Sequence, residues 1–115
     1  MVLDTQNHID GIKNMRKIKF RAWDSKLLRF TYFHLFNVIG SISEEDKSTI
    51  QQFTGLLDRN GKEIYEGDLV SVLWNHDKFL ISFKNGCFVM ATVPLAYYCK
   101  ECEVIGNMYE TPITS

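Results

Sequence analysis

The patterned part of the chain begins with a run in which apolar and polar residues alternate. In "KIKFRAW", residues 17–23, the residue character changes at nearly every position. Successive side chains of a β-strand point to opposite faces of the sheet, so this run predicts a half-buried strand. One face would carry Ile18, Phe20 and Ala22, and the other Lys17, Lys19, Arg21 and Trp23. After a turn at 24–26, the aromatic-rich run "LLRFTYFHLF", residues 27–36, predicts a second strand.

Short extended segments continue to the end of the chain. They are predicted over residues 50–54, 63–65, 69–74, 79–83, 87–93 and 103–110. The turns between them are signalled by Gly, Asn and Asp at 58–61, 67–68, 75–78 and 84–86. Trp74 is expected in the core, since it alternates in step with Val70 and Val72. Gly106 indicates a bulge or a close backbone approach within the last strand.

Helix signals are few. Ser43 with Asp46 three residues later fits the start of a short helical turn. The stretch "PLAYYCKEC", residues 94–102, is a connection that has room for one helical turn. The chain therefore predicts a mainly β fold, with α+β as the open alternative. Its form would be a small, strongly bent sheet or a barrel of short antiparallel strands, with one or two short helical turns.

The length of 115 residues fits one domain. Residues 1–14 are polar and are expected to form an N-terminal extension. Residues 15–115 are expected to form a single domain, with N-terminal strands over 15–54 and a barrel-like part over 55–115.

Charge and cysteine content narrow the class of protein. The net charge of −1 argues against a dedicated nonspecific nucleic-acid binder, whose affinity comes from neutralising phosphates. No apolar run reaches the roughly 18 residues that a membrane span needs, so no membrane association is expected. The N-terminus lacks the basic and apolar regions of a secretory signal. With three cysteines, an odd number, the sequence predicts free thiols in a reducing cytoplasm.

Three motifs occur in a fixed order along the chain. They are "RKIKFRAWD", "QFTGLLDRNGKEIYEGDLV", and "EVIGNMYE" followed by Pro112. Together they resemble the YopX-like family of small bacteriophage and prophage proteins, over Met15 to Pro112. The resemblance implies a phage or prophage product in a bacterial cytoplasm, and it implies no established activity or catalytic residues. Separately, "YEGDLVSV" resembles the start of a strand in an SH3-like barrel, a likeness of fold that does not determine function.

Metal sites are disfavoured by ligand spacing. Asp58, Asn60 and Gly61 match part of a calcium loop, but its first and last ligand positions then fall on Leu56 and Gly67. Neither residue supplies a side-chain oxygen, so a turn is the preferred interpretation. Zinc at Cys99 and Cys102 would need two more ligands, such as Cys87 and His76. Free, partly buried thiols are expected instead, and no metal or cofactor is predicted.

The sequence contains few residues in the patterns that catalytic sites use. The three histidines, His8, His34 and His76, accompany no nucleophile motif, and no glycine-rich phosphate loop occurs. The acidic residues Asp58, Glu63, Glu66 and Asp68 lie close in sequence. They could act as acid and base or bind Mg²⁺, although turn-forming and solvated roles are commoner. An enzyme of this kind would bring Asp58 and Asp68 into one cleft.

The strongest candidate binding surface is the face of the first strand that carries Lys17, Lys19, Arg21 and Trp23. A basic row ending in an aromatic ring could contact phosphates and stack on a base. A solvated outer face of a sheet is the favoured alternative, because lysine also protects edge strands against aggregation.

The leading functional hypothesis is a non-enzymatic phage accessory protein that binds a protein partner or a second copy of itself. The alternative is a nucleic-acid-binding small barrel that uses the basic first strand. A second alternative is an enzyme that uses the acidic turn residues. No small-molecule substrate is indicated.

Overall fold

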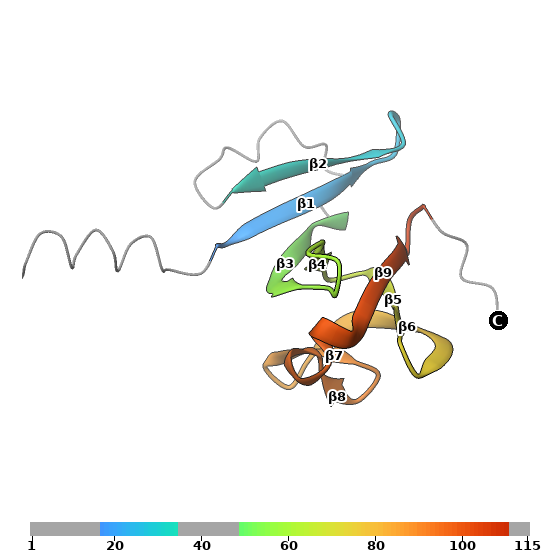
Figure 1. The fold of residues 1–115 in the computed structure, drawn as a ribbon. Coiled ribbons are helices and arrows are strands. Elements are labelled where there is room, and N and C mark those ends of the chain that lie inside the picture. The colour runs from blue at the N-terminus through green and yellow to red at the C-terminus, as the bar shows by residue number, and fades with distance from the viewer. Residues whose placement is uncertain (1–16, 35–48, 111–115) are drawn as a thin grey trace, which may run out of the picture.

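The computed structural model describes residues 17–34 and 49–110. The first of two sheets contains β1 (Lys19–Asp24), β2 (Arg29–His34), β3 (Gln51–Leu57) and β4 (Glu63–Tyr65). Its strand order is β2-β1-β3-β4, and each neighbouring pair is antiparallel. Figure 1 shows this sheet in the upper half of the molecule.

The second sheet has five strands and lies below the first (Figure 1). It contains β5 (Asp68–Val72), β6 (Asn75–Lys84), β7 (Cys87–Met90), β8 (Val93–Pro94) and β9 (Cys102–Asn107). The order is β8-β7-β6-β5-β9, again antiparallel throughout. Two short 3-10 turns, η2 (Leu95–Tyr97) and η3 (Cys99–Glu101), connect β8 to β9.

The prediction of a mainly β fold is confirmed, since the strands form two antiparallel sheets. Within the described ranges, no helix is longer than these two 3-10 turns. The connection at 94–102 holds two helical turns where one was predicted. Both sheets are open among the described residues, so the strand order does not show a closed SH3-like barrel. No helix in this part of the chain is long and apolar enough to span a membrane.

The main hydrophobic core lies between the second sheet and β4. Its most buried members are Ile64, Val70, Ile81, Leu95 and Cys102. Ile64 comes from β4, so the first sheet contributes one face of its last strand to this core. Val70 and Val72 alternate inward from β5, as the sequence pattern predicts.

Trp74 was expected in the core and is instead 59% exposed. The strand β5 ends at Val72, and residues 73–74 form the turn to β6. Alternation between faces applies only within a strand, so it no longer directs Trp74 inward. The turn predicted at 75–78 was therefore placed too late, because β6 already begins at Asn75.

Other local predictions are confirmed. The turn at 84–86 joins β6 to β7 as a hairpin. Gly106 pairs with Leu69 while Val104 pairs with Val70, which leaves Ile105 as the extra residue of a bulge. The extension over 1–14 and the helical turn at Ser43 lie outside the described residues.

The cysteines do not gather into one site. Cys99 and Cys102 are buried in the core, and Cys87 is half-buried on β7. Burial raises the pKa of the Cys102 thiol to about 11, and its Sγ lies 3.6 Å from the sulfur of Met90. Among the described side chains, no three from His, Cys, Asp and Glu are grouped as a metal site requires.

Candidate functional site

A buried ion pair joins the two sheets. Arg21 lies on β1, is 5% exposed, and donates from Nη2 to Asp68 Oδ1 at 2.7 Å. Its Nε donates to Gln51 Oε1 at 2.9 Å, so β3 helps to orient the guanidinium. Asp68 begins β5 and is buried as well. Removing either partner would leave a charge in a poorly solvated place, which is costly.

Aromatic rings enclose the Arg21 guanidinium. Its central carbon lies 4.0 Å from the centre of the Phe30 ring and 4.6 Å from that of Tyr65. The second oxygen of Asp68 accepts a hydrogen bond from the Tyr65 backbone N–H at 2.8 Å. Burial raises the pKa of Asp68, although Arg21 and this N–H act in the opposite direction. Burial also raises the pKa of Tyr65 to about 12.

Asp58 fastens the turn at 58–61 to β9. Its Oδ1 accepts from the backbone N–H groups of Asn60 at 2.8 Å and Lys62 at 2.9 Å. Its Oδ2 accepts from the N–H of Val104 at 2.9 Å. Burial alone raises the pKa of Asp58, but the three N–H donors together outweigh burial and hold it below the usual value. The predicted turn is confirmed, and its Asp also binds a strand 46 residues away.

The Asp58→Asn variant is expected to lose about 1 to 3 kcal/mol of unfolding free energy at pH 7, since an amide cannot accept all three N–H groups. The folded pKa of Asp58 lies below its ordinary value of 3.8, so its contribution is complete above that pH. The contribution is lost as the pH falls below 3.8 through the folded pKa. Denaturant titrations of both proteins between pH 7 and 2.5 should show their difference shrinking with acid.

The control for this measurement is Glu101→Gln, an exposed carboxyl on η3. It should stay within about 0.5 kcal/mol of the parent protein at each pH. A difference between the Asp58→Asn variant and the parent that does not change with pH would contradict the role assigned to the Asp58 carboxylate.

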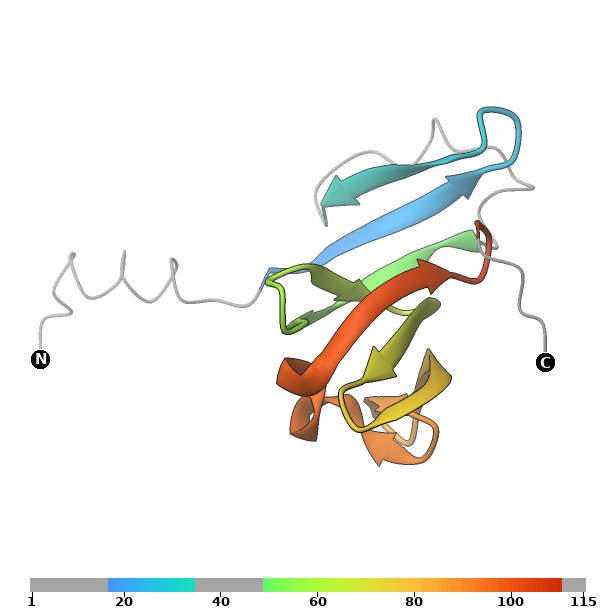
Figure 2. The same cartoon turned by 45° about the vertical axis from the view of Figure 1, so that its right-hand side comes forward.

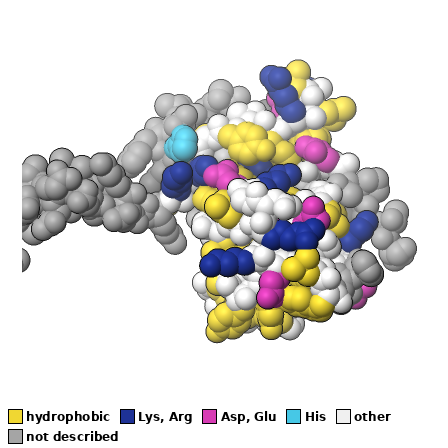
Figure 3. Space-filling view, viewed as in Figure 1, with side chains coloured by type: hydrophobic (Ala, Val, Ile, Leu, Met, Phe, Trp, Pro, Cys, Tyr) yellow, Lys and Arg dark blue, Asp and Glu magenta, His cyan; other side chains and the backbone are white. Residues whose placement is uncertain are grey.

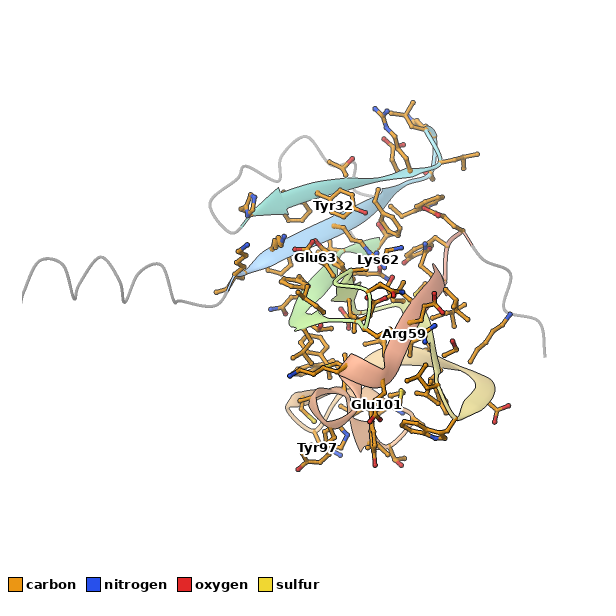
Figure 4. All side chains as sticks on the ribbon, in the orientation of Figure 1. Tyr32, Arg59, Lys62, Glu63, Tyr97 and Glu101 are labelled. Carbon is orange, nitrogen blue, oxygen red and sulfur yellow. The ribbon has the colours of Figure 1, made fainter. Side chains whose placement is uncertain are left out.

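A pocket of about 490 Å³ lies where the first sheet meets β9. Its floor is one face of the first sheet, made of Arg21, Phe30, Tyr32, Glu63 and Tyr65. Its wall is β9 over residues 104–107, and Lys62 and Glu110 stand at its rim. Figure 2 shows β9 running beside the first sheet, and Figure 4 shows Tyr32, Lys62 and Glu63 gathered on that side.

The family follows from comparison with known sequences. A sequence profile described as YopX protein matches residues 37–113, more than half of the chain. The chain belongs to the YopX family. The matched region contains the pocket residues from Lys62 to Glu110 but not Arg21, Phe30 or Tyr32. The comparison with curated proteins finds no match.

A solved structure shares the fold of this YopX family chain. It is the crystal structure of protein EF1440 from Enterococcus faecalis, with a TM-score of 0.56 and 23% sequence identity. The alignment covers 84% of this chain and 96% of that one. At this level of identity the likeness concerns the fold alone.

The basic row on β1 is placed differently from the prediction. Lys17 is exposed, whereas Lys19 forms an ion pair with Glu63, and Arg21 is buried against Asp68. Trp23 is half-buried, and its ring stacks on Tyr109 at 5.7 Å. Arg21 does not lie on an outer face, because this side of the first sheet meets β5 and the end of β9. The alternative of a solvated face describes Lys17 but not Arg21.

The surface charge of this YopX family chain is mixed. In Figure 3, basic and acidic side chains alternate over the middle of the visible face, and hydrophobic ones gather toward its lower end. Such a face lacks the continuous positive potential that a polyanion requires.

Asp58 and Asp68 do not converge on one cleft, although Glu63 and Asp68 both line the pocket. Asp68 lines the pocket, but Asp58 does not. Both are buried, and each accepts backbone N–H groups that hold a turn or a strand start in place. Neither lies on an exposed turn.

The sequence interpretation missed the aromatic part of the pocket. Tyr32 lies opposite Arg21 in the β1–β2 pair, and Phe30 lies opposite Trp23. Directly opposed residues of an antiparallel pair share a face, so pairing the two predicted strands about the turn at 24–28 would have placed these rings beside Arg21. No comparable local signal links β9 to this face.

Proposed function

We propose that this chain is a non-enzymatic binding module of a phage or prophage, and that its pocket takes a protein partner or a second copy of the chain. The phage origin rests on the resemblance of the three sequence motifs to YopX-like proteins. The binding role rests on the pocket at β9.

One observation carries the proposal: three charged groups that line the pocket, Arg21, Glu63 and Asp68, are already bonded within the fold. Arg21 pairs with Asp68, Asp68 also accepts from Tyr65 N–H, and Glu63 pairs with Lys19. A general acid or base must be able to exchange its proton with a substrate. Because these charged side chains are already bonded to each other or to the backbone, the pocket is better suited to binding a partner than to proton transfer.

Exposed apolar side chains support binding to protein. Tyr32 and Ile105 are 60% and 40% exposed, and both line the pocket. Aromatic side chains are enriched where proteins bind each other, since they bury a large area with few rotatable bonds.

The test combines light scattering with affinity capture. The purified full chain is run over a range of concentrations by size-exclusion chromatography with light scattering. A tagged copy is then expressed in host bacteria and captured for mass spectrometry. We expect either a concentration-dependent dimer or a partner retained in stoichiometric amount. A strict monomer that captures no protein from the host would refute the proposal.

A further inference from the structure

The wall of the pocket is a sheet edge. Four consecutive residues of β9, 104–107, line it. The bulge at Ile105 interrupts the alternation of side chains within this stretch. β9 is also the last strand in the order of its sheet, beside β5. The backbone edge of β9 that faces away from β5 therefore borders the pocket.

The chain itself pairs with the beginning of this edge. Arg59 N–H donates to the carbonyl of Cys102 at 2.9 Å, and Val104 N–H donates to Asp58 Oδ2 at 2.9 Å. The turn at 58–61 thus bonds to β9 in the manner of a neighbouring strand. The pocket opens along the residues that follow Val104, as β9 continues toward Asn107.

The floor beneath this edge is aromatic. Tyr32 packs edge-on against Tyr65 at 5.8 Å between ring centres and tilts toward Phe30 at 6.2 Å. The Arg21 guanidinium packs against the rings of Tyr65 and Phe30, whereas the Tyr32 ring is mostly open to solvent. A rigid aromatic surface next to an open strand edge combines the two features that extended peptides use: backbone pairing for affinity and side-chain contacts for specificity.

We propose that the pocket binds an extended polypeptide segment of a partner protein, which pairs with the edge of β9 and packs an apolar or aromatic side chain on Tyr32. This inference rests on the proposed binding function and specifies its site and its partner chemistry. The pocket is lined by two cationic side chains, Arg21 and Lys62, and three carboxylates, Glu63, Asp68 and Glu110, so its charges nearly cancel. That balance suits a polypeptide of mixed charge and disfavours a nucleic-acid strand.

The test uses a displayed library of random 12-residue peptides selected against the full chain. Enriched peptides are synthesised, and their affinity is measured by fluorescence anisotropy for the parent protein and two variants. Tyr32→Ala should weaken binding at least tenfold, because an exposed aromatic anchor is removed. The matched control is Tyr97→Ala, the same change at a 76% exposed ring on η2, at the opposite end of the molecule (Figure 4). It should change affinity less than twofold.

Hydrogen exchange supplies the second readout. Bound peptide should slow exchange of backbone amides within 104–107, whereas an attachment through side chains alone would leave them unchanged. Peptides insensitive to Tyr32→Ala, the absence of new protection on β9, or a library that yields no enriched peptide would each overturn the inference. A natural partner that is captured equally by the parent and the Tyr32→Ala variant would refute this site while leaving the binding function intact.

Discussion

Replacing Arg21 with Met is expected to lower the unfolding free energy by about 3 to 5 kcal/mol, the cost of leaving one member of a buried ion pair uncompensated. Asp68 would keep its bond to Tyr65 N–H but lose its cationic partner. Equilibrium denaturation at pH 7 measures the loss. The control is Lys17→Met, an exposed cation on the same predicted row, which should change stability by less than about 0.5 kcal/mol.

The loss of stability caused by the unpaired Asp68 charge can be separated from a simple loss of packing. Burial raises the folded pKa of Asp68, so its ionised form disfavours folding, and protonation at low pH relieves that cost. The deficit of the Arg21→Met variant should therefore be largest at neutral pH and shrink as the pH falls. Adding Asp68→Asn to Arg21→Met should also recover part of the loss. A deficit below about 1 kcal/mol at pH 7 would show that the pair is not needed to join the sheets.

Replacing Gly67 with Ala is the second large effect, with an expected loss of about 2 to 4 kcal/mol from backbone strain and a displaced side chain. Gly67 has φ +87°, and an added Cβ would collide with Nε2 of Gln51. Gln51 is buried and holds Arg21 Nε, so its displacement would also disturb the ion pair. Thermal and chemical unfolding measure the loss.

Gly55→Ala is the matched control for Gly67→Ala. Gly55 has nearly the same backbone angle, φ +84°, with nothing within 4 Å of the added Cβ. Its replacement should cost about 1 to 2 kcal/mol, the strain of the left-handed backbone alone. Equal losses at the two glycines would mean that the close approach to Gln51 contributes nothing.

The two sheets depend on this small region. The Gly67 N–H donates to the carbonyl of Ile81 at 2.8 Å, and its own carbonyl accepts from Met108 N–H at 2.9 Å. Glu66 N–H donates to the carbonyl of Gln52 at 3.0 Å. The turn at 66–67 therefore bonds to β3, to β6 and to the segment after β9. A change here should disturb the pocket as well as the global stability.

Local pattern predicted much of the fold. Alternation located most strands, and the Asn-Gly and Asp-containing segments located the turns at 58–61 and 84–86. These signals are reliable because strand periodicity and turn geometry arise within a few residues. Trp74 was misplaced since alternation carries no information about where a strand stops.

The candidate site was harder to predict because its members come from distant strands. Arg21, Asp68 and Val104 span much of the sequence, yet they meet beside one pocket. A basic row on a strand looks the same in sequence whether it faces solvent or a second sheet. The carboxylate that turns Arg21 inward lies 47 residues away.

The sequence by itself determined that the chain belongs to the YopX family, that it forms a mainly β fold, and where most of its turns lie. Each of these follows from residue identity at short range. Only the tertiary structure decided that Arg21 is buried against Asp68, that the carboxylates of Asp58 and Asp68 accept backbone N–H groups, and that β9 is, among the described strands, the last of its sheet and lies beside aromatic rings. The physical reason is that burial and charge pairing depend on which strands meet, and no local pattern encodes that contact.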